Sequence, residues 1–209
     1  MITKLGKDKR DLLAMTAIAK GLTNTDFFLA GIRLVQNNSS DGFDDILMAV
    51  TIDEAYSCPG TTKTGVYGTQ NPVTYKGKTG GAWLFPDFYK DVYVLGIHGR
   101  SNPAFAHEAF IQCGTFKFFR DENMDGDIDL VEAMQIGDDT GINFHRASSQ
   151  SNVARIGLYG IGCQVVQDHE DLEKFVSLWK STDTFKKDQK AKISYLLIEG
   201  QYAKERGII

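Results

Sequence analysis

The sequence predicts a mainly β fold with few helices. Apolar runs of strand length recur along the chain, over residues 27–35, 45–52, 91–98, 109–120 and 193–199. Only residues 8–20 and 168–179 carry apolar side chains at helical spacing. The chain has 209 residues, of which 42% are hydrophobic, so it is long enough to bury a sizeable core. Many short strands with few helices indicate a β-rich architecture.

The first helix is expected over Asp8–Lys20, with Gly21 as its stop signal. Its apolar face consists of Leu12, Leu13, Ala17 and Ile18. We therefore expect a helical segment over residues 1–22 and a single β-rich domain over residues 23–209.

The remaining segments follow in order. Phe27–Val35 and Asp45–Ile52 are expected strands on either side of a turn at residues 36–42, and Tyr56–Gly81 is an expected long loop, rich in Gly, Thr and Lys. Further on, the expected elements are a strand at Asp91–His98, a strand at Ala109–Arg120, an acidic loop at Asp121–Thr140, short buried strands at Gly141–Arg146 and Ile156–Val166, a helix at Asp168–Trp179 with Asp168 as N-cap, and a last strand at Ile193–Glu199.

Composition argues against several classes of partner. The formal net charge is −4 and the pI is about 5.6, so no nucleic-acid partner is expected. The lysines of residues 186–192 are expected on a solvated helix face. No stretch has the length of a membrane span, and Met1–Lys20 lacks the apolar core of a signal peptide, so we expect synthesis in a cytoplasm and no membrane partner.

The chain contains three cysteines, Cys58, Cys113 and Cys163. Their odd and sparse number argues against a disulfide framework and against a zinc site built on paired cysteines. Cys163 follows three glycines at positions 157, 160 and 162, and it stands eighteen positions after His145. Glycine lets the backbone approach closely and can leave N–H groups free to face a developing oxyanion.

Cys163 and His145 are the candidate nucleophile and base, because an imidazole within hydrogen-bond reach can activate a thiol. We expect the two side chains to lie within that reach, or slightly beyond it. The alternatives are a buried cysteine on an inner strand and a histidine satisfied within the core. His98, at the end of an expected strand, is a further catalytic candidate with the same alternative, whereas His107 and His169 are expected to be exposed.

Residues 121–132 match the twelve-residue calcium loop, with oxygen-bearing side chains at the ligand positions, Gly126 at the sixth and an apolar residue at the eighth. Because the preceding segment is an expected strand, a paired EF-hand is not predicted. The loop is a candidate Ca²⁺ site, with an acidic turn as the alternative, and no cofactor is expected to be required for catalysis. The candidate ligands are Asp121, Asn123, Asp125, Asp127, Asp129 and Glu132.

The histidine, the eighteen-residue step and the glycine-framed cysteine resemble the catalytic domain of the L,D-transpeptidase (YkuD-type) family. The signature of that family is a histidine followed, after fourteen to seventeen residues, by Ser/Thr-His-Gly-Cys. Here fourteen residues separate His145 from Gly160, which opens the segment Gly160-Ile161-Gly162-Cys163. The wider order of motifs over residues 45–199 is similar to that of a subgroup of this family found in Bacteroidetes bacteria and their phages.

The resemblance implies a β-rich sandwich with the cysteine at the end of a strand. It also implies that Cys163 attacks a carbonyl of a peptidoglycan stem peptide containing meso-diaminopimelate, with His145 as base and later acid. Backbone N–H groups near Gly162 and Cys163 would hold the oxyanion. Water as acceptor would give hydrolysis, and an amine would give cross-linking.

Two positions depart from the family pattern. Ile161 stands where the family has its second histidine, and Val165 stands where it has a polar residue, so Gln164 and Arg146 become candidates for the missing polar function. The alternative function is therefore a non-catalytic structural or binding protein of a virion, in contact with other virion proteins. A papain-like amidase is disfavoured by the order of the two residues. Without a signal peptide, a phage lysin or virion part that opens the cell wall is expected rather than a secreted host enzyme.

Overall fold

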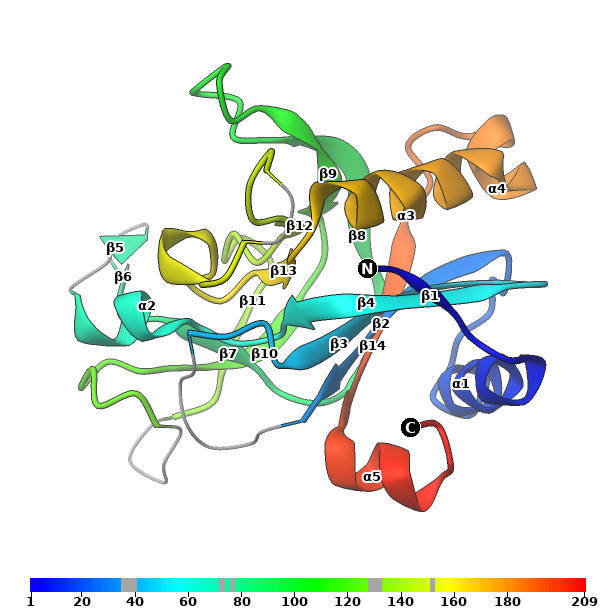
Figure 1. Ribbon diagram of the computed structural model, residues 1–209, viewed down its shortest axis with the longest axis horizontal. Coiled ribbons are helices and arrows are strands. Elements are labelled where there is room, and N and C mark those ends of the chain that lie inside the picture. Colours follow the sequence, from blue (N-terminus) through cyan, green and yellow to red (C-terminus); the bar gives the residue numbers. More distant parts are fainter. Residues whose placement is uncertain (35–40, 72–73, 76–77, 128–132, 151–152) are drawn as a thin grey trace.

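The computed structural model describes residues 1–34, 41–71, 74–75, 78–127, 133–150 and 153–209. Within these residues, eight strands close into a barrel, because β3 pairs with β2 on one side and with β4 on the other (Figure 1). The order around the barrel is β4 (Ala55–Thr61), β13 (Gln164–Val166), β12 (Phe144–Arg146), β9 (His107–Gln112), β8 (Phe88–His98), β14 (Ile193–Glu199), β2 (Phe27–Arg33) and β3 (Asp45–Thr51).

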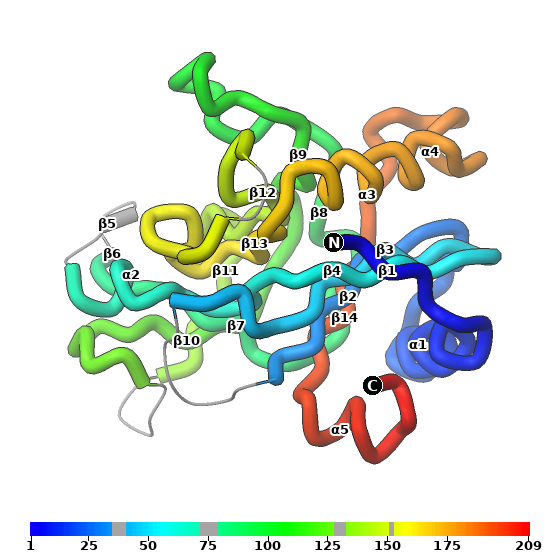
Figure 2. The backbone as a smooth tube through the Cα atoms, viewed as in Figure 1, coloured from blue at the N-terminus to red at the C-terminus, as the bar shows by residue number. Residues whose placement is uncertain are grey.

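Parallel pairing occurs twice around this barrel, between β14 and β2 and between β12 and β13, and the other neighbours are antiparallel. Figure 2 shows the path of the chain through these strands as a tube. The short strand β1 (Thr3–Lys4) pairs with β4. Two small sheets lie outside the ring, one of β7 (Ala82–Leu84), β10 (Phe116–Arg120) and β11 (Gln135–Gly137), the other of β5 (Thr74–Tyr75) and β6 (Lys78–Thr79).

Short helical segments lie around the barrel and do not form a layer of their own. They are α1 (Lys7–Ala19), α2 (Val66–Gln70), the 3₁₀ turn η1 (Gly157–Tyr159), α3 (His169–Ser181), α4 (Asp183–Lys187) and α5 (Gly200–Glu205). Among the described residues, no helix combines the length and the apolar character needed to cross a membrane.

The larger core fills the barrel and continues onto α3. The ring of Phe27 on β2 lies 5.3 Å from Trp179, and the ring of Phe144 on β12 lies 6.1 Å from Phe175, so side chains of α3 reach strands on both sides of the barrel. Asp168 is the N-cap of α3, as the sequence predicts, and accepts a hydrogen bond from the backbone N–H of Glu170.

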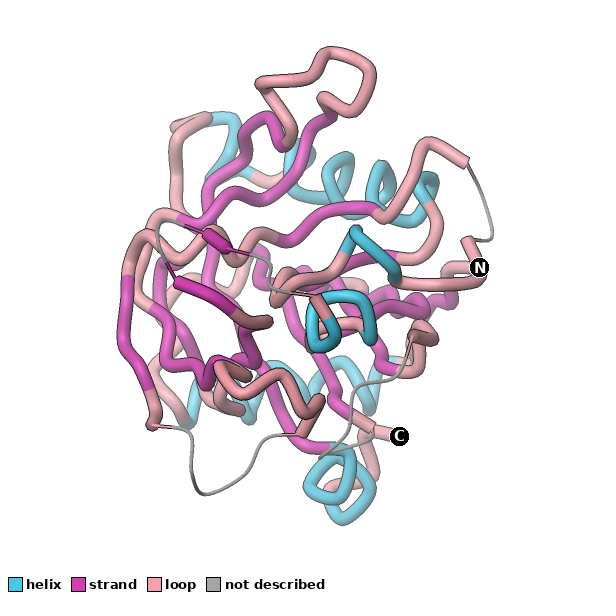
Figure 3. Tube along the Cα trace, turned by 90° about the vertical axis from the view of Figure 1, so that its left-hand side faces the viewer, coloured by secondary structure: helices cyan, strands magenta, loops and turns pink. Residues whose placement is uncertain are grey.

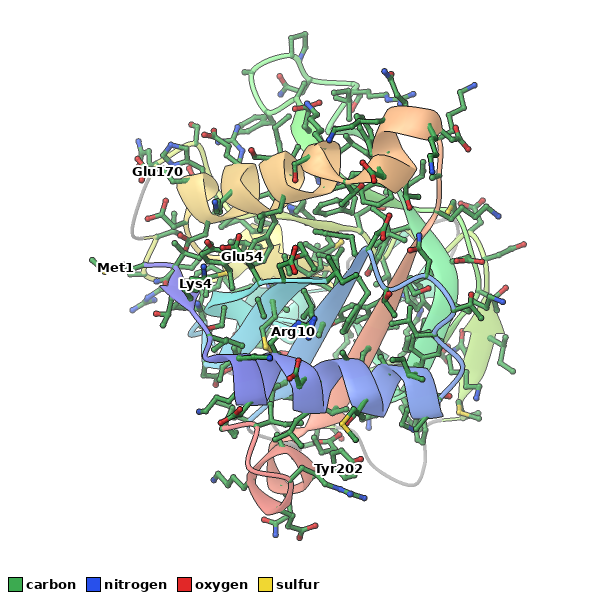
Figure 4. All side chains as sticks on the ribbon, turned by 90° about the vertical axis from the view of Figure 1, so that its right-hand side faces the viewer. Met1, Lys4, Arg10, Glu54, Glu170 and Tyr202 are labelled. Atoms are coloured by element: carbon green, nitrogen blue, oxygen red, sulfur yellow. The ribbon has the colours of Figure 1, made fainter. Side chains whose placement is uncertain are left out.

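A second core lies between the outer face of the barrel and helices α1 and α5. Leu13 and Ala17 of α1 are fully buried there against β2 and β3, whereas Ile18, expected on the same apolar face, is 50% exposed. Figure 4 shows α1 running across this face, with Lys4 above it beside its ion-pair partner Glu54. Residues 1–22 therefore pack onto the barrel, and the boundary at residue 22 stays a prediction.

The mainly β fold with few helices is confirmed, but the expected sandwich is wrong. The pairing of β3 with β4 leaves no gap between two sheets and closes the sheet on itself. The expected helices over Asp8–Lys20 and Asp168–Trp179 and the strands over Phe27–Val35, Asp45–Ile52, Asp91–His98 and Ile193–Glu199 are present with shifted ends.

Other segments differ from expectation. The expected loop Tyr56–Gly81 contains β4 and α2, because residues 55–61 pair with β3 despite their glycine and proline. The expected strand Ala109–Arg120 is two strands, since the N–H groups of Cys113 and Gly114 both donate to Val92 and turn the chain. In Ile156–Val166 only the last three residues form a strand, and the acidic loop contains β11.

We expect Phe175→Ala to lower the free energy of unfolding by about 3–5 kcal/mol, because it removes a large buried ring between α3 and the barrel. Ser177→Ala, on the exposed side of the same helix, is the control and is expected to change it by less than about 0.5 kcal/mol. Denaturant unfolding measures both. Equal changes in the free energy of unfolding for the two variants would show that Phe175 does not contribute to packing between α3 and the barrel.

Candidate functional site

The candidate residues gather at a pocket of about 300 Å³ beside β12 and β13. The parallel register aligns His145 with Val165, two residues after Cys163, and both Cys163 and His145 line the pocket. His98, from the end of β8, lines it as well. The pocket also takes residues of η1, and Figure 3 looks onto the side of the molecule where η1 and α2 lie side by side.

Cys163 is a neutral thiol in this structure. Its Sγ donates a hydrogen bond to the carbonyl oxygen of Gly141 at 3.3 Å. Burial raises the pKa of the thiol to about 11, and the backbone N–H of Asn143 opposes this only in part. The side chain still lines the pocket wall and is partly exposed. An acid with this pKa is protonated at neutral pH, so its nucleophilic form requires a base.

Gly162 fixes the backbone that leads into Cys163. Its φ of +122° is rarely adopted by other residues, and an added Cβ would lie 2.7 Å from the Cβ of Ala82 and 2.9 Å from the Ala82 carbonyl oxygen. The N–H of Ala82 in turn donates to the carbonyl of Ile161 at 3.2 Å. Within the described residues, the backbone N–H groups of Gly162 and Cys163 donate no hydrogen bond.

His145 carries its hydrogen on Nδ1. Nδ1 lies 2.7 Å from the carbonyl oxygen of Arg146, which can only accept, so the ring must donate there. Nε2 is then left with a lone pair and is the atom that can take a proton. Burial, followed by the neighbouring His98, lowers the pKa of His145 well below 6.5. The imidazole of His145 is therefore neutral at neutral pH and can accept a proton at Nε2.

His98 has the opposite tautomer. The Asn143 side-chain oxygen accepts the backbone N–H of Gln112 at 2.9 Å, which turns its amide nitrogen toward Nδ1 of His98 at 3.2 Å. Nδ1 therefore accepts, and the hydrogen of His98 is on Nε2. The ring stacks on His145 with centroids 3.9 Å apart and planes 9° apart. Burial and the neighbouring His107 lower the pKa of His98 to about 4, so the stacked pair is neutral.

The pocket continues beyond the two stacked rings. His98 and His145 also line a second pocket of about 180 Å³, together with His107 and Arg146. His107 and Arg146 line a third one of about 370 Å³, along α3. His107, expected to be exposed, is only partly so, because it sits against this histidine cluster and donates from Nδ1 to the carbonyl of Phe105. His169, also expected to be exposed, is partly buried at the start of α3.

The expected pair is brought to one pocket but does not form a hydrogen bond. Within the described part of the chain, the Cys163 thiol bonds the Gly141 carbonyl and His145 bonds its own neighbour's carbonyl. Gln164 is fully buried, and its side-chain oxygen accepts a hydrogen bond from the hydroxyl of Tyr195 at 2.6 Å. Gln164 therefore contacts the interior of the barrel rather than the pocket. Arg146 is partly exposed and donates to the carbonyl of Ser148.

The acidic loop folds through side-chain contacts to its own backbone. The Asp121 carboxylate is buried and accepts the N–H groups of Asp125 and Gly126, and burial raises its pKa. Asn123 donates to the carboxylate of Asp125, and Asp125 accepts the N–H of Asp127. In the described residues no three acidic, histidine or cysteine side chains converge as metal ligands. Asp129 and Glu132 lie outside the described residues, so calcium binding stays a prediction.

Arg120 is a pocket-lining residue that sequence reasoning misses. It lines the Cys163 pocket at the end of β10 and is only 5% exposed. The signal was present in the sequence: Phe116, Phe118 and Arg120 alternate with two less buried residues, so all three face inward.

Comparison of the chain with models of known families, with curated proteins and with solved structures gives no match. The resemblance to the L,D-transpeptidase family therefore stays a prediction.

We expect Gly162→Ala to lower the free energy of unfolding by about 2 kcal/mol or more, because both φ and the contact with Ala82 oppose a side chain. Gly157→Ala is the matched control: its φ is also positive, but nothing lies within 4 Å of the added Cβ, so about 1 kcal/mol is expected. Thermal and denaturant unfolding compare the two. A smaller effect at position 162 would contradict the close approach to Ala82.

For the acidic loop we expect added Ca²⁺ to raise the melting temperature, because a ligand that binds only the folded state stabilises it. Asp125→Ala should abolish the shift by removing a candidate ligand. Calorimetric titration of both proteins measures binding directly. Absence of heat and of any thermal shift in the unaltered protein would reduce the loop to an acidic turn.

Proposed function

We propose that this protein is a cysteine-nucleophile enzyme of the L,D-transpeptidase type that acts on stem peptides of peptidoglycan. The observation that carries the proposal is the tautomer of His145, which leaves Nε2 unprotonated on a ring that lines the same pocket as Cys163. A neutral thiol and a neutral imidazole are the two reactants that general-base activation needs. The substrate class rests on the resemblance of His145 and the Gly160–Cys163 segment to the family motif.

The proposed reaction starts from the neutral pair. The thiol leaves the Gly141 carbonyl and gives its proton to Nε2 of His145 as Sγ attacks the carbonyl carbon of the peptide bond. The resulting imidazolium returns the proton to the leaving amine, and a thioester to Cys163 remains. Water or a second amine then attacks the thioester, with His145 again taking and returning the proton.

Stabilisation of the oxyanion falls to donors with no partner inside the described residues. These are the backbone N–H groups of Gly162 and Cys163, and the Nε2–H of His98. Ile161 occupies the place of the family's second histidine, and the stacked His98 supplies an imidazole to the same pocket from β8. Preorganised donors of this kind contribute about 3–4 kcal/mol each when they face the developing charge.

We expect Cys163→Ala to abolish cleavage or cross-linking of muropeptides while the melting temperature stays nearly unchanged, because the thiol is small and its hydrogen bonds are weak. Cys113→Ala, a cysteine outside the pocket, is the control and should keep full activity. Mass spectrometry of purified muropeptides is the assay. Equal activity of the Cys163 variant would end the cysteine-enzyme proposal and favour a binding protein of a virion.

The pH dependence follows from the two pKa shifts. The base must be neutral, and burial lowers the pKa of His145 well below 6.5, so kcat/KM should stay level as the pH falls through 6.5 and decline only well below that value. The thiol has the opposite shift: its reaction with iodoacetamide, which needs thiolate, should keep accelerating toward a pKa of about 11.

Iodoacetamide labelling of a variant that retains only Cys163 measures the pKa of this thiol without any substrate. A plateau in the labelling rate below pH 8 would mean that thiolate and imidazolium coexist at rest, which contradicts the neutral pair.

A further inference from the structure

Arg120 is a charged side chain held almost entirely inside the protein. It is 5% exposed, and its Nη1 donates to the carbonyl oxygen of Gly80 at 2.6 Å. Its guanidinium lies 5.5 Å from the centre of the Phe118 ring. The Nε atom is buried and has no hydrogen-bond partner. A guanidinium has five donors, so the protein leaves much of this one unsatisfied.

The positive charge of Arg120 also lacks an acidic partner. No carboxylate of the described residues lies within ion-pair distance of it. Glu122 acts on it only through space, and that exposed side chain accepts from Gln135 instead. A buried charge is costly unless it is paired, so an unpaired buried arginine indicates a partner that arrives with a ligand.

The place of Arg120 identifies where that ligand would bind. It lines the same pocket of about 300 Å³ as Cys163, whose lining contains no Asp or Glu. Cys163, His98 and His145 are neutral at neutral pH, because burial shifts their pKa values away from it. Arg120 therefore gives the described pocket a single formal charge, and it is positive.

We propose that Arg120 is the carboxylate-binding residue of the Cys163 pocket and anchors a free carboxylate of the peptide substrate. The assignment deepens the proposed function and rests on it for the identity of the peptide. A guanidinium pairs with a carboxylate through two parallel N–H···O bonds, which fixes orientation as well as position. A carboxylate held there would set the neighbouring carbonyl against Sγ without any charge on the catalytic pair.

The test compares a stem tetrapeptide containing meso-diaminopimelate with the same peptide amidated at one carboxylate at a time. For the unaltered protein, we expect one amide to lower kcat/KM about tenfold or more. Arg120→Gln should lose this discrimination and process the acid and that amide alike, and Arg120→Lys should keep part of it. Because the ratio is measured within each protein, a partial loss of folded protein cancels. Arg206→Gln, at an exposed arginine that immediately follows α5, is the control and should keep the full ratio.

Binding measurements distinguish the carboxylate-binding role of Arg120 from the catalytic role proposed for Cys163. Calorimetry of the Cys163→Ala protein with the same peptides should give the same preference for the acid, again removed by Arg120→Gln. Carboxylate-dependent binding without any turnover would leave the Arg120 assignment standing and end the enzymatic proposal. Equal kcat/KM and equal affinity for the acid and every amide, or discrimination that survives Arg120→Gln, would overturn the assignment.

Discussion

Two strands of three residues each, β12 and β13, hold the two halves of the candidate site in register. Their parallel pairing aligns Phe144 with Gln164 and His145 with Val165, and a backbone bond from Gln164 to Asn143 continues the alignment toward Cys163. Short strands carry little stability of their own, so the barrel must fix them. It does so on both sides, since β12 also pairs with β9 and β13 also pairs with β4.

Polar contacts inside the barrel add to this constraint. The buried hydroxyl of Tyr195 on β14 reaches across to the side chain of Gln164, the residue that follows the candidate nucleophile. Nearby, the guanidinium of Arg33 donates to Thr62 and to the carbonyl of Leu84, and Asp45 accepts from Thr62. Satisfied buried networks of this kind specify one arrangement of their strands, because any shift leaves polar groups unpaired. The position of Cys163 is thereby tied to the core rather than to a surface loop.

Local sequence patterns predicted most individual elements and the two residues at the centre of the site. The spacing from His145 to Cys163 and the glycines before the cysteine indicated a pocket that both side chains do line. Barrel closure depends on pairing between β3 and β4, and β4 contains Pro59 and Gly60, which local propensity assigns to a loop. The tautomer of His98 depends on Gln112 and Asn143, which are distant in sequence, so no motif encodes it. Arg120 was readable from the alternation along β10, but only with the knowledge that this strand faces the pocket.

The neutral state of the thiol has a consequence for chemical durability. Oxidants such as peroxide attack thiolates, and a cysteine whose pKa is about 11 presents almost none at neutral pH. Burial also raises the pKa of Cys58 and of Cys113, so the shift has the same direction for all three thiols. The same burial that would make Cys163 depend on His145 in the proposed reaction therefore slows oxidation of the thiol at neutral pH.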